Sequence, residues 1–178
     1  MNIKINRIEK VFEGKRFNVE RREISIDGKE VIRDIVVFPE SVVILPLLRE
    51  DTILLIKQYR PALNNYIYEV PAGVVEPGEP IREAALRELE EEIGYTAKEL
   101  VEIGSYYPTP GYSTEKMHFF IAKNLEYTGA KPEPYEVIEP YVIRLEEALK
   151  LIKDGVINDL KTVAIIMLYT NFYKNGGV

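Results

Sequence analysis

Three glutamates stand close together in one predicted helix, where they could hold a metal ion. Residues 81–93 are mostly good helix formers, and Glu88 and Glu92 lie four residues apart in them, with Glu91 beside them. Like charges at this spacing destabilise an isolated helix by about 0.2–0.5 kcal/mol per pair. A divalent ion such as Mg2+ reverses this effect, because it binds carboxylate oxygens and keeps positions for water and phosphates. The alternative interpretation is a solvated acidic face.

A loop rich in glycine and proline precedes this helix and sets where it begins. Pro77 and Gly78 interrupt regular structure, and Pro80 suits the first helical turn, where its missing N–H costs nothing. Gly94 suits a left-handed cap at the other end. One face of the helix is apolar and is therefore predicted to be buried; it carries Ile81, Ala85, Leu89 and Ile93.

The stretch from Gly73 to Tyr95 resembles the Nudix box, and all of the motif's fixed positions are filled. These are Gly73, Glu79, Arg87, Glu88, Leu89, Glu91, Glu92, Gly94 and Tyr95. Tyr95 stands where the family usually has an aliphatic residue, which affects packing and not chemistry. The resemblance implies a hydrolase of nucleoside diphosphates linked to another moiety, with Mg2+ or Mn2+ as cofactor. It also implies an α/β (α+β) fold, in which a mixed β-sheet is sandwiched between helices.

Three segments outside the box resemble the ADP-ribose pyrophosphatase branch of this family. They are the QYR run at 58–60, the EVPAG run at 69–73 and the PGYS run at 110–113. Arg60 can direct two N–H donors at a diphosphate. The resemblance therefore implies a substrate-binding set of Arg60, Glu69, Pro110, Gly111 and Tyr112, and a reaction that yields AMP and ribose 5-phosphate. For the PGYS run, the alternative is an ordinary turn.

The family resemblance also implies the metal ligands and the proton acceptor. The expected metal ligands are the main-chain carbonyl of Ala72 and the carboxylates of Glu88, Glu91, Glu92 and Glu136. The expected catalytic residues are Glu136, with Glu133 as the next choice, and Glu91. Glu79 and Arg87 are assigned mainly to structure, as an ion pair that fixes the loop at the helix start.

Two further functions stay open beside ADP-ribose hydrolysis. The first is hydrolysis of another nucleoside diphosphate sugar or of a dinucleotide; an oxidised-nucleotide sanitiser fits less well, because the PGYS run matches another branch. The second is a non-catalytic module that binds a nucleotide. Such modules usually lose box carboxylates, whereas this chain keeps all of them.

Composition excludes several other classes of function. The 178 residues suit one domain with a sizeable core. The absence of cysteine excludes disulfides and thiolate sites, and the single histidine, His118, is expected to be structural. A net charge of -6 argues against a nucleic-acid partner. Without an apolar run that could span a bilayer or serve as a signal peptide, we expect a cytoplasmic protein with no membrane partner.

The remaining pattern predicts a small N-terminal sheet at 1–40 and a Nudix domain at 41–178. Alternating runs at 3–12, 16–26 and 31–38 predict three antiparallel strands, with a tight hairpin at Asp27-Gly28. This sheet has too little apolar surface to stand alone. We expect it to form a homodimer, as similar sheets do in the resembled branch; the alternative is that it caps its own core.

Strands, loops and helices follow in the predicted Nudix domain. Buried strands are expected at 41–48 and 52–59, with an edge or a bulge at Pro46, and further strands at 97–107 and 116–122. Residues 129–140 are expected to form an acidic loop. Amphipathic helices are predicted at 145–153 and 159–173.

Overall fold

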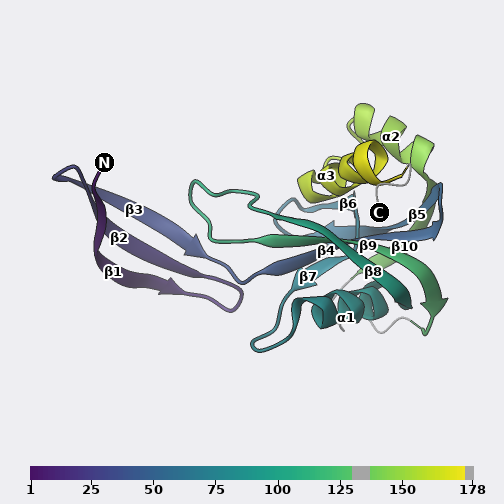
Figure 1. Cartoon of the computed structure of the whole chain (residues 1–178), viewed down its shortest axis with the longest axis horizontal. Coiled ribbons are helices and arrows are strands. Elements are labelled where there is room, and N and C mark those ends of the chain that lie inside the picture. The colour runs from purple at the N-terminus through teal and green to yellow at the C-terminus, as the bar shows by residue number, and fades with distance from the viewer. Residues whose placement is uncertain (130–136, 175–178) are drawn as a thin grey trace. The chain divides into compact units, whose positions relative to one another are not determined.

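The computed structural model describes residues 1–129 and 137–174, which form two compact units (Figure 1). The first unit contains Met1–Glu40 together with Tyr106–Met117, and the second contains Ser41–Ser105 and the chain from His118 onward. Glu133 and Glu136 lie outside the described residues.

The first unit is built on an antiparallel sheet of three strands. These are β1 (Ile3–Glu13), β2 (Asn18–Ile26) and β3 (Lys29–Val37), paired in that order. Asp27 and Gly28 join β2 to β3 with φ values of 47° and 81°, as a two-residue hairpin requires. The three predicted strands and the hairpin are therefore confirmed. The unit exposes many large apolar side chains, namely Ile3, Ile5, Ile8, Val11, Phe12, Phe17 and Ile32.

The PGYS loop belongs to this first unit and is fixed to the end of β3. The Val36 N–H donates to the Tyr112 carbonyl at 2.8 Å, and the Thr114 N–H donates to the Val36 carbonyl at 3.0 Å. The Thr114 hydroxyl also bonds both the N–H and the carbonyl of Phe38. The loop is thus held at Tyr112 and at Thr114, and the side chain of Tyr112 is 56% exposed.

A mixed sheet forms the centre of the second unit. The described strands run in the order β10–β5–β4–β9–β8, with β6 beside β5 and β7 beside β4. Their bounds are β4 Ser41–Arg49, β5 Thr52–Arg60, β6 Asn65–Glu69, β7 Ala72–Val74, β8 Tyr95–Tyr106, β9 Met117–Tyr127 and β10 Ile138–Arg144.

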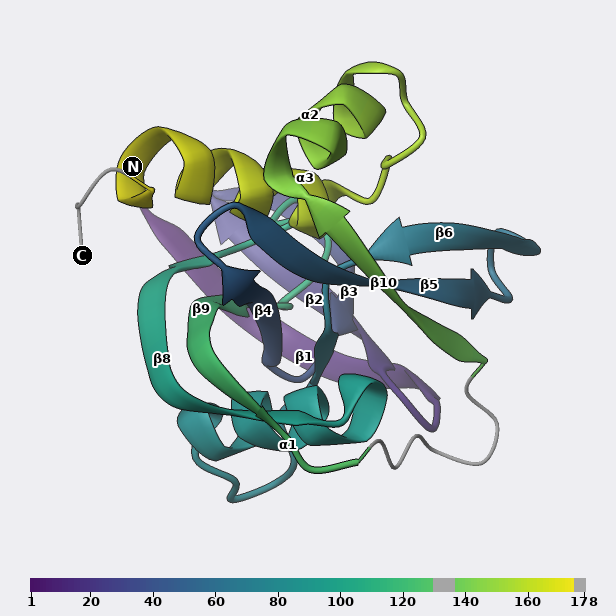
Figure 2. The same ribbon diagram turned by 90° about the vertical axis from the view of Figure 1, so that its right-hand side faces the viewer.

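Helices cover both faces of this sheet, as the family resemblance predicted (Figures 1 and 2). Helix α1 (Ile81–Ile93) lies on one face; α2 (Leu145–Lys153) and α3 (Leu160–Leu168), which continues into a π-helical turn at Tyr169–Tyr173, lie on the other. Gly94 adopts the predicted left-handed cap, with φ 74°. Among the described residues, no helix is long and apolar enough to cross a membrane.

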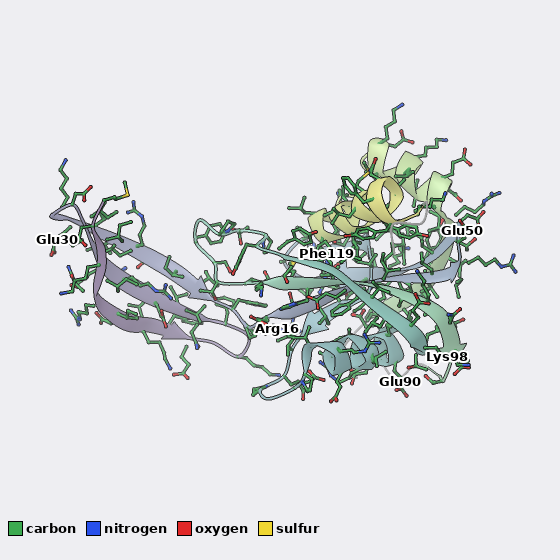
Figure 3. All side chains as sticks on the ribbon, viewed as in Figure 1. Arg16, Glu30, Glu50, Glu90, Lys98 and Phe119 are labelled. Atoms are coloured by element: carbon green, nitrogen blue, oxygen red, sulfur yellow. The ribbon has the colours of Figure 1, made fainter. Side chains whose placement is uncertain are left out.

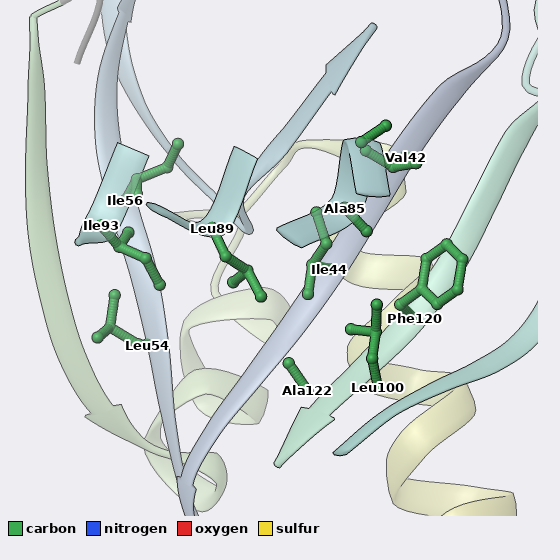
Figure 4. Close-up of a cluster of buried hydrophobic side chains, with 11 residues drawn as sticks. Val42, Ile44, Leu54, Ile56, Ala85, Leu89, Ile93, Leu100, Phe120 and Ala122 are labelled. Atoms are coloured by element: carbon green, nitrogen blue, oxygen red, sulfur yellow. The ribbon is translucent and has the colours of Figure 1, made fainter. Parts of the chain in front are cut away.

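The core beneath α1 explains why the predicted apolar stripe of that helix is buried. Ala85, Leu89 and Ile93 pack against aliphatic side chains of β4 and β5 (Figure 4). Successive residues of a strand point to opposite faces. Phe120 therefore joins this cluster, whereas Phe119 of the same strand points to the face covered by α2 and α3 (Figure 3).

The structure corrects the sequence prediction at three places. Residues 138–140, expected in a loop, begin β10 and pair with β5, with Ile138 opposite Gln58. The short strands β6 and β7 were not predicted, because Pro71 and nearby polar residues mask the apolar pattern. Pro46 does not lie at a sheet edge, because β4 is an inner strand; the register shift of β4 against β5 lies just after it, between Leu47 and Arg49.

We expect Leu89→Ala to lower the free energy of unfolding by about 2–5 kcal/mol, since Leu89 is fully buried under the sheet. Urea unfolding at pH 7 measures this loss. Leu160→Ala, the same change at a side chain that is 68% exposed, is the matched control. Equal losses in both variants would contradict the described packing of α1.

Candidate functional site

Strand β7 brings the start of the box against helix α1. Gly73 pairs with Val42 of β4, so its backbone position is fixed by the sheet. A Cβ atom built on Gly73 would overlap the carboxylate of Glu88. Glycine here lets the carboxylate approach the backbone closely, and a larger residue would force the Glu88 side chain to shift.

Arg87 organises the carboxylates of the box. Its Nε donates to Glu79 at 2.8 Å, and its Nη1 donates to Glu88 at 2.8 Å and to Glu91 at 2.9 Å. Its Nη2 also reaches the Val74 carbonyl at 3.0 Å, which ties the loop to the helix. These contacts, with the hydrogen bonds to Glu79 as the largest cause, raise the pKa of Arg87. The same bonds lower the pKa of Glu79.

Glu92 connects α1 to the chain just before the box. Its Oε2 accepts a hydrogen bond from the Ala72 N–H at 3.1 Å. Glu92 and Glu88 are only 4% and 9% exposed, whereas Glu91 is more open. Two nearly buried carboxylates and the main chain of Ala72 and Gly73 thus meet at one point of the second unit.

This arrangement suits a hard divalent ion in its donor chemistry. Carboxylate and carbonyl oxygens are the ligands that Mg2+ takes in proteins, and it needs only one or two carboxylates beside water and phosphate. The absence of a side chain at Gly73 lets the carboxylate of Glu88 lie close to the main chain. Within residues 1–129 and 137–174, no group of three or more Asp, Glu, His or Cys side chains is arranged as a metal site. The assignments of Ala72, Glu88, Glu91 and Glu92 as ligands stay predictions.

A second ionic cluster surrounds Arg60, at the end of β5. Arg60 donates from Nε to Glu69 at 2.5 Å and from Nη2 at 2.7 Å, and Lys161 of α3 pairs with the same carboxylate. Burial opposes ionisation of Glu69, which is 1% exposed, but the hydrogen bond from Arg60 and the charge of Lys161 outweigh it. The pKa of Glu69 therefore lies below its ordinary value.

Arg60 also lies within the electrostatic reach of the box. Burial would lower its pKa, but the hydrogen bond and charge of Glu69 and the charges of Glu92 and Asp159 raise it. The Arg60 side chain is 32% exposed, and Glu69 engages its Nε and Nη2. Arg60 is thus a partly accessible cation that interacts electrostatically with Glu92 of α1, and its contact with a substrate stays a prediction.

The start of α3 holds this second cluster in place, and sequence reasoning missed it. Asp159 caps the helix by accepting from the Thr162 N–H at 3.0 Å, and it pairs with Lys161 at 3.0 Å. The Thr162 hydroxyl accepts from the Val70 N–H at 2.9 Å. An Asp-x-x-Thr cap is visible in the sequence, but nothing local shows that Lys161 meets Glu69, 92 residues away.

The other predicted substrate residues lie in a different unit from the box. Pro110, Gly111 and Tyr112 belong to the first unit, where the Tyr112 and Ser113 N–H groups both donate to the Thr109 carbonyl. Their contact with substrate stays a prediction.

His118 is nearly buried in β9, as expected for a structural residue. Its Nδ1 lies 3.4 Å from the Ser105 hydroxyl and 3.3 Å from Glu102.

Comparisons with known proteins agree with this geometry. A family model described as the NUDIX domain matches residues 37–164. An ADP-ribose pyrophosphatase of Bacillus subtilis is 39% identical over 89% of this chain and 87% of its own length. The ADP compounds hydrolase NudE of Escherichia coli is 30% identical over 78% of this chain and 74% of its own. A crystal structure of an ADP compounds hydrolase superposes with a TM-score of 0.88 at 26% identity, covering 100% of this chain and 98% of that one.

We expect Glu69→Gln to weaken the dependence of stability on acid pH. A carboxyl whose pKa is lowered by folding stabilises the protein above its unfolded value of 4.5. This contribution is lost as pH falls through the lower folded pKa, and the glutamine lacks it at any pH. Urea unfolding at pH 7 and pH 3.5 should show a smaller stability loss on acidification in Glu69→Gln than in wild type.

The exposed Glu147 of α2 provides the control, since Glu147→Gln also removes one carboxylate. An acid-induced loss in Glu69→Gln equal to that of wild type would contradict the buried ion pair.

Proposed function

The chain belongs to the NUDIX domain family and is a Nudix pyrophosphatase, and from this premise we propose that it hydrolyses ADP-ribose to AMP and ribose 5-phosphate. The observation that carries the chemistry is the Arg87 cluster, which holds the box carboxylates beside Gly73. The substrate is supported by the 39% identity to a relative named ADP-ribose pyrophosphatase.

The proposed metal site uses the carboxylates of Glu88, Glu92 and Glu91 with the Ala72 carbonyl. The ion, Mg2+ or Mn2+, would lower the pKa of water and offset the charge that develops on the phosphates. Arg87 keeps Glu88 and Glu91 in fixed positions through its Nη1, so little reorganisation is needed on binding.

Arg60 is proposed to bind the diphosphate. A guanidinium directs several N–H groups at phosphate oxygens, and the Nη1 of Arg60 lies outside the pair that Glu69 engages. Glu69 then acts by orienting Arg60 and not by touching the substrate. Glu136, or alternatively Glu133, is proposed to accept the proton of the attacking water. Attack of one water on one phosphorus breaks the P–O bond to the bridging oxygen of the diphosphate and gives AMP and ribose 5-phosphate.

A second candidate is hydrolysis of other compounds that contain ADP. The E. coli relative and the superposed crystal structure are both named ADP compounds hydrolase. The box and Arg60 contact only the diphosphate in the proposed arrangement, so they serve this alternative equally well.

The substrate is tested by AMP release from ADP-ribose, NADH, GDP-mannose, diadenosine tetraphosphate and 8-oxo-dGTP, with GMP or 8-oxo-dGMP followed where no adenosine is present. We expect the highest kcat/KM for ADP-ribose, and loss of turnover when a chelator removes divalent ions. A preference for another compound would refute the substrate while keeping the chemistry, and turnover that resists the chelator would refute the metal.

We expect Glu92→Gln to lower kcat/KM by about 100-fold or more, because even partners one step removed from a metal contribute about 10–100-fold. Glu83→Gln is the control: it removes a carboxylate from the exposed first turn of the same helix. A Glu92→Gln variant with wild-type turnover would exclude Glu92 from the site. If wild type and the variant both bind nucleotide without hydrolysing it, the result would favour a non-catalytic binding module.

We also propose a homodimer formed through the first unit, whose sheet exposes apolar side chains along β1. Burying this surface against a second copy is favourable by about 25 cal/mol per Å2. Light scattering at micromolar concentration should give twice the chain mass of 20.5 kDa. A mass of one chain would refute this assembly.

A further inference from the structure

The only glutamine of the sequence, Gln58, is buried in β5 with an unsatisfied oxygen. The residue is 4% exposed, and its Oε1 has no hydrogen-bond partner among the described residues. A buried acceptor without a partner costs about 1–3 kcal/mol. Such groups are rare in folded proteins, and each one calls for a physical explanation.

Strand register places Gln58 under the second ionic cluster. Residues two apart in a strand share a face. Gln58 therefore lies on the face of β5 that carries Ile56 and Arg60, and Ile56 packs toward α1 in the core cluster. Across β6, Arg60 is opposite Asn65, Gln58 is opposite Ile67, and Ile56 is opposite Glu69.

The Arg60–Glu69 pair consequently crosses the position of Gln58. On this face of the sheet, the Gln58–Ile67 pair lies between the Arg60–Asn65 pair and the Ile56–Glu69 pair. The guanidinium of Arg60 meets the carboxylate of Glu69 at 2.5 Å, so the ion pair spans the intervening Gln58–Ile67 pair. Gln58 therefore lies on the same face of the sheet as Arg60, between the two residues of the ion pair.

We infer that Gln58 is a further positioning residue of this site, whose Oε1 accepts a hydrogen bond from an O–H group of the bound substrate or of a water held beside it. The inference rests on the proposed function, since it uses Arg60 as a diphosphate ligand. Among the described residues this oxygen has no partner, and we infer that filling the site supplies one. Neither Arg60 nor Lys161 donates to this oxygen: the Nε and Nη2 of Arg60 and the Nζ of Lys161 are directed at Glu69.

The test compares Gln58→Met with Leu55→Met. Methionine is unbranched and close to glutamine in shape, but it lacks the amide. Leu55 lies in the same strand on the opposite face and is fully buried, so its variant reports the general effect of altering β5. The thermal midpoint Tm of the free protein and the kcat and KM for ADP-ribose are measured for both variants and for wild type.

We expect Gln58→Met to have a Tm equal to or above that of wild type, together with a kcat/KM roughly ten-fold lower, as the loss of one hydrogen bond in the loaded site implies. Leu55→Met should keep wild-type turnover. A raised KM at constant kcat assigns the O–H group to the substrate, and a lowered kcat at constant KM assigns it to the water.

Two results would overturn the inference. One is a Gln58→Met variant with clearly lower Tm than Leu55→Met, because Gln58 would then stabilise the free fold. The other is unchanged turnover. If wild type does not hydrolyse ADP-ribose, the proposed substrate is wrong, and the kinetics are repeated with the compound that it does hydrolyse. The Tm comparison needs no substrate: a clearly lower Tm of Gln58→Met indicates a structural role, and an equal or higher Tm argues against one.

Discussion

The structure of the box depends on one guanidinium in the middle of four carbonyl or carboxylate groups. Arg87 contacts Glu79, Glu88 and Glu91 through distances of 2.8–2.9 Å and also holds the Val74 carbonyl. Without it, the carboxylates of α1 would repel one another and the preceding loop would lose its anchor. Gly73 fits this arrangement, because the carboxylate of Glu88 occupies the space that a side chain at position 73 would take.

A second cation is held by a different means and completes the proposed site. Arg60 is oriented by Glu69, which is almost fully buried; the hydrogen bond from Arg60 and the charge of Lys161 nevertheless lower the pKa of Glu69. Lys161 comes from α3, whose cap at Asp159 fixes the helix start. Helix α3 lies on one face of the sheet and contributes Lys161, which pairs with the Glu69 that orients Arg60. Arg60 in turn interacts electrostatically with Glu92 of α1, which covers the other face. The proposed site thus combines the carboxylates of α1, which suit a metal ion, with Arg60, which suits a phosphate. Arg87 holds the former, and Glu69 with Lys161 holds the latter.

Much of the fold followed from local sequence signals, and the rest depended on distant contacts. Helix α1 and its cap at Gly94 were predicted because apolar spacing and glycine act within a few residues. The Glu69–Lys161 pair was not, because no local pattern links residues 92 positions apart. The position of Gln58 between Arg60 and Glu69 was also not predicted, since it depends on the register of β5 with β6. The docking of Tyr112 beside β3 escaped for the same reason.

Manganese binding, followed by electron paramagnetic resonance in the absence of substrate, tests the metal site most directly. Wild type and Glu83→Gln should bind Mn2+ with similar affinity, whereas Glu88→Gln should bind at least about ten-fold more weakly, as loss of a ligand requires. Glu88 is nearly buried, and its carboxylate lies against the main chain at Gly73. Undiminished Mn2+ binding by Glu88→Gln would contradict the assignment of these carboxylates to a metal ion.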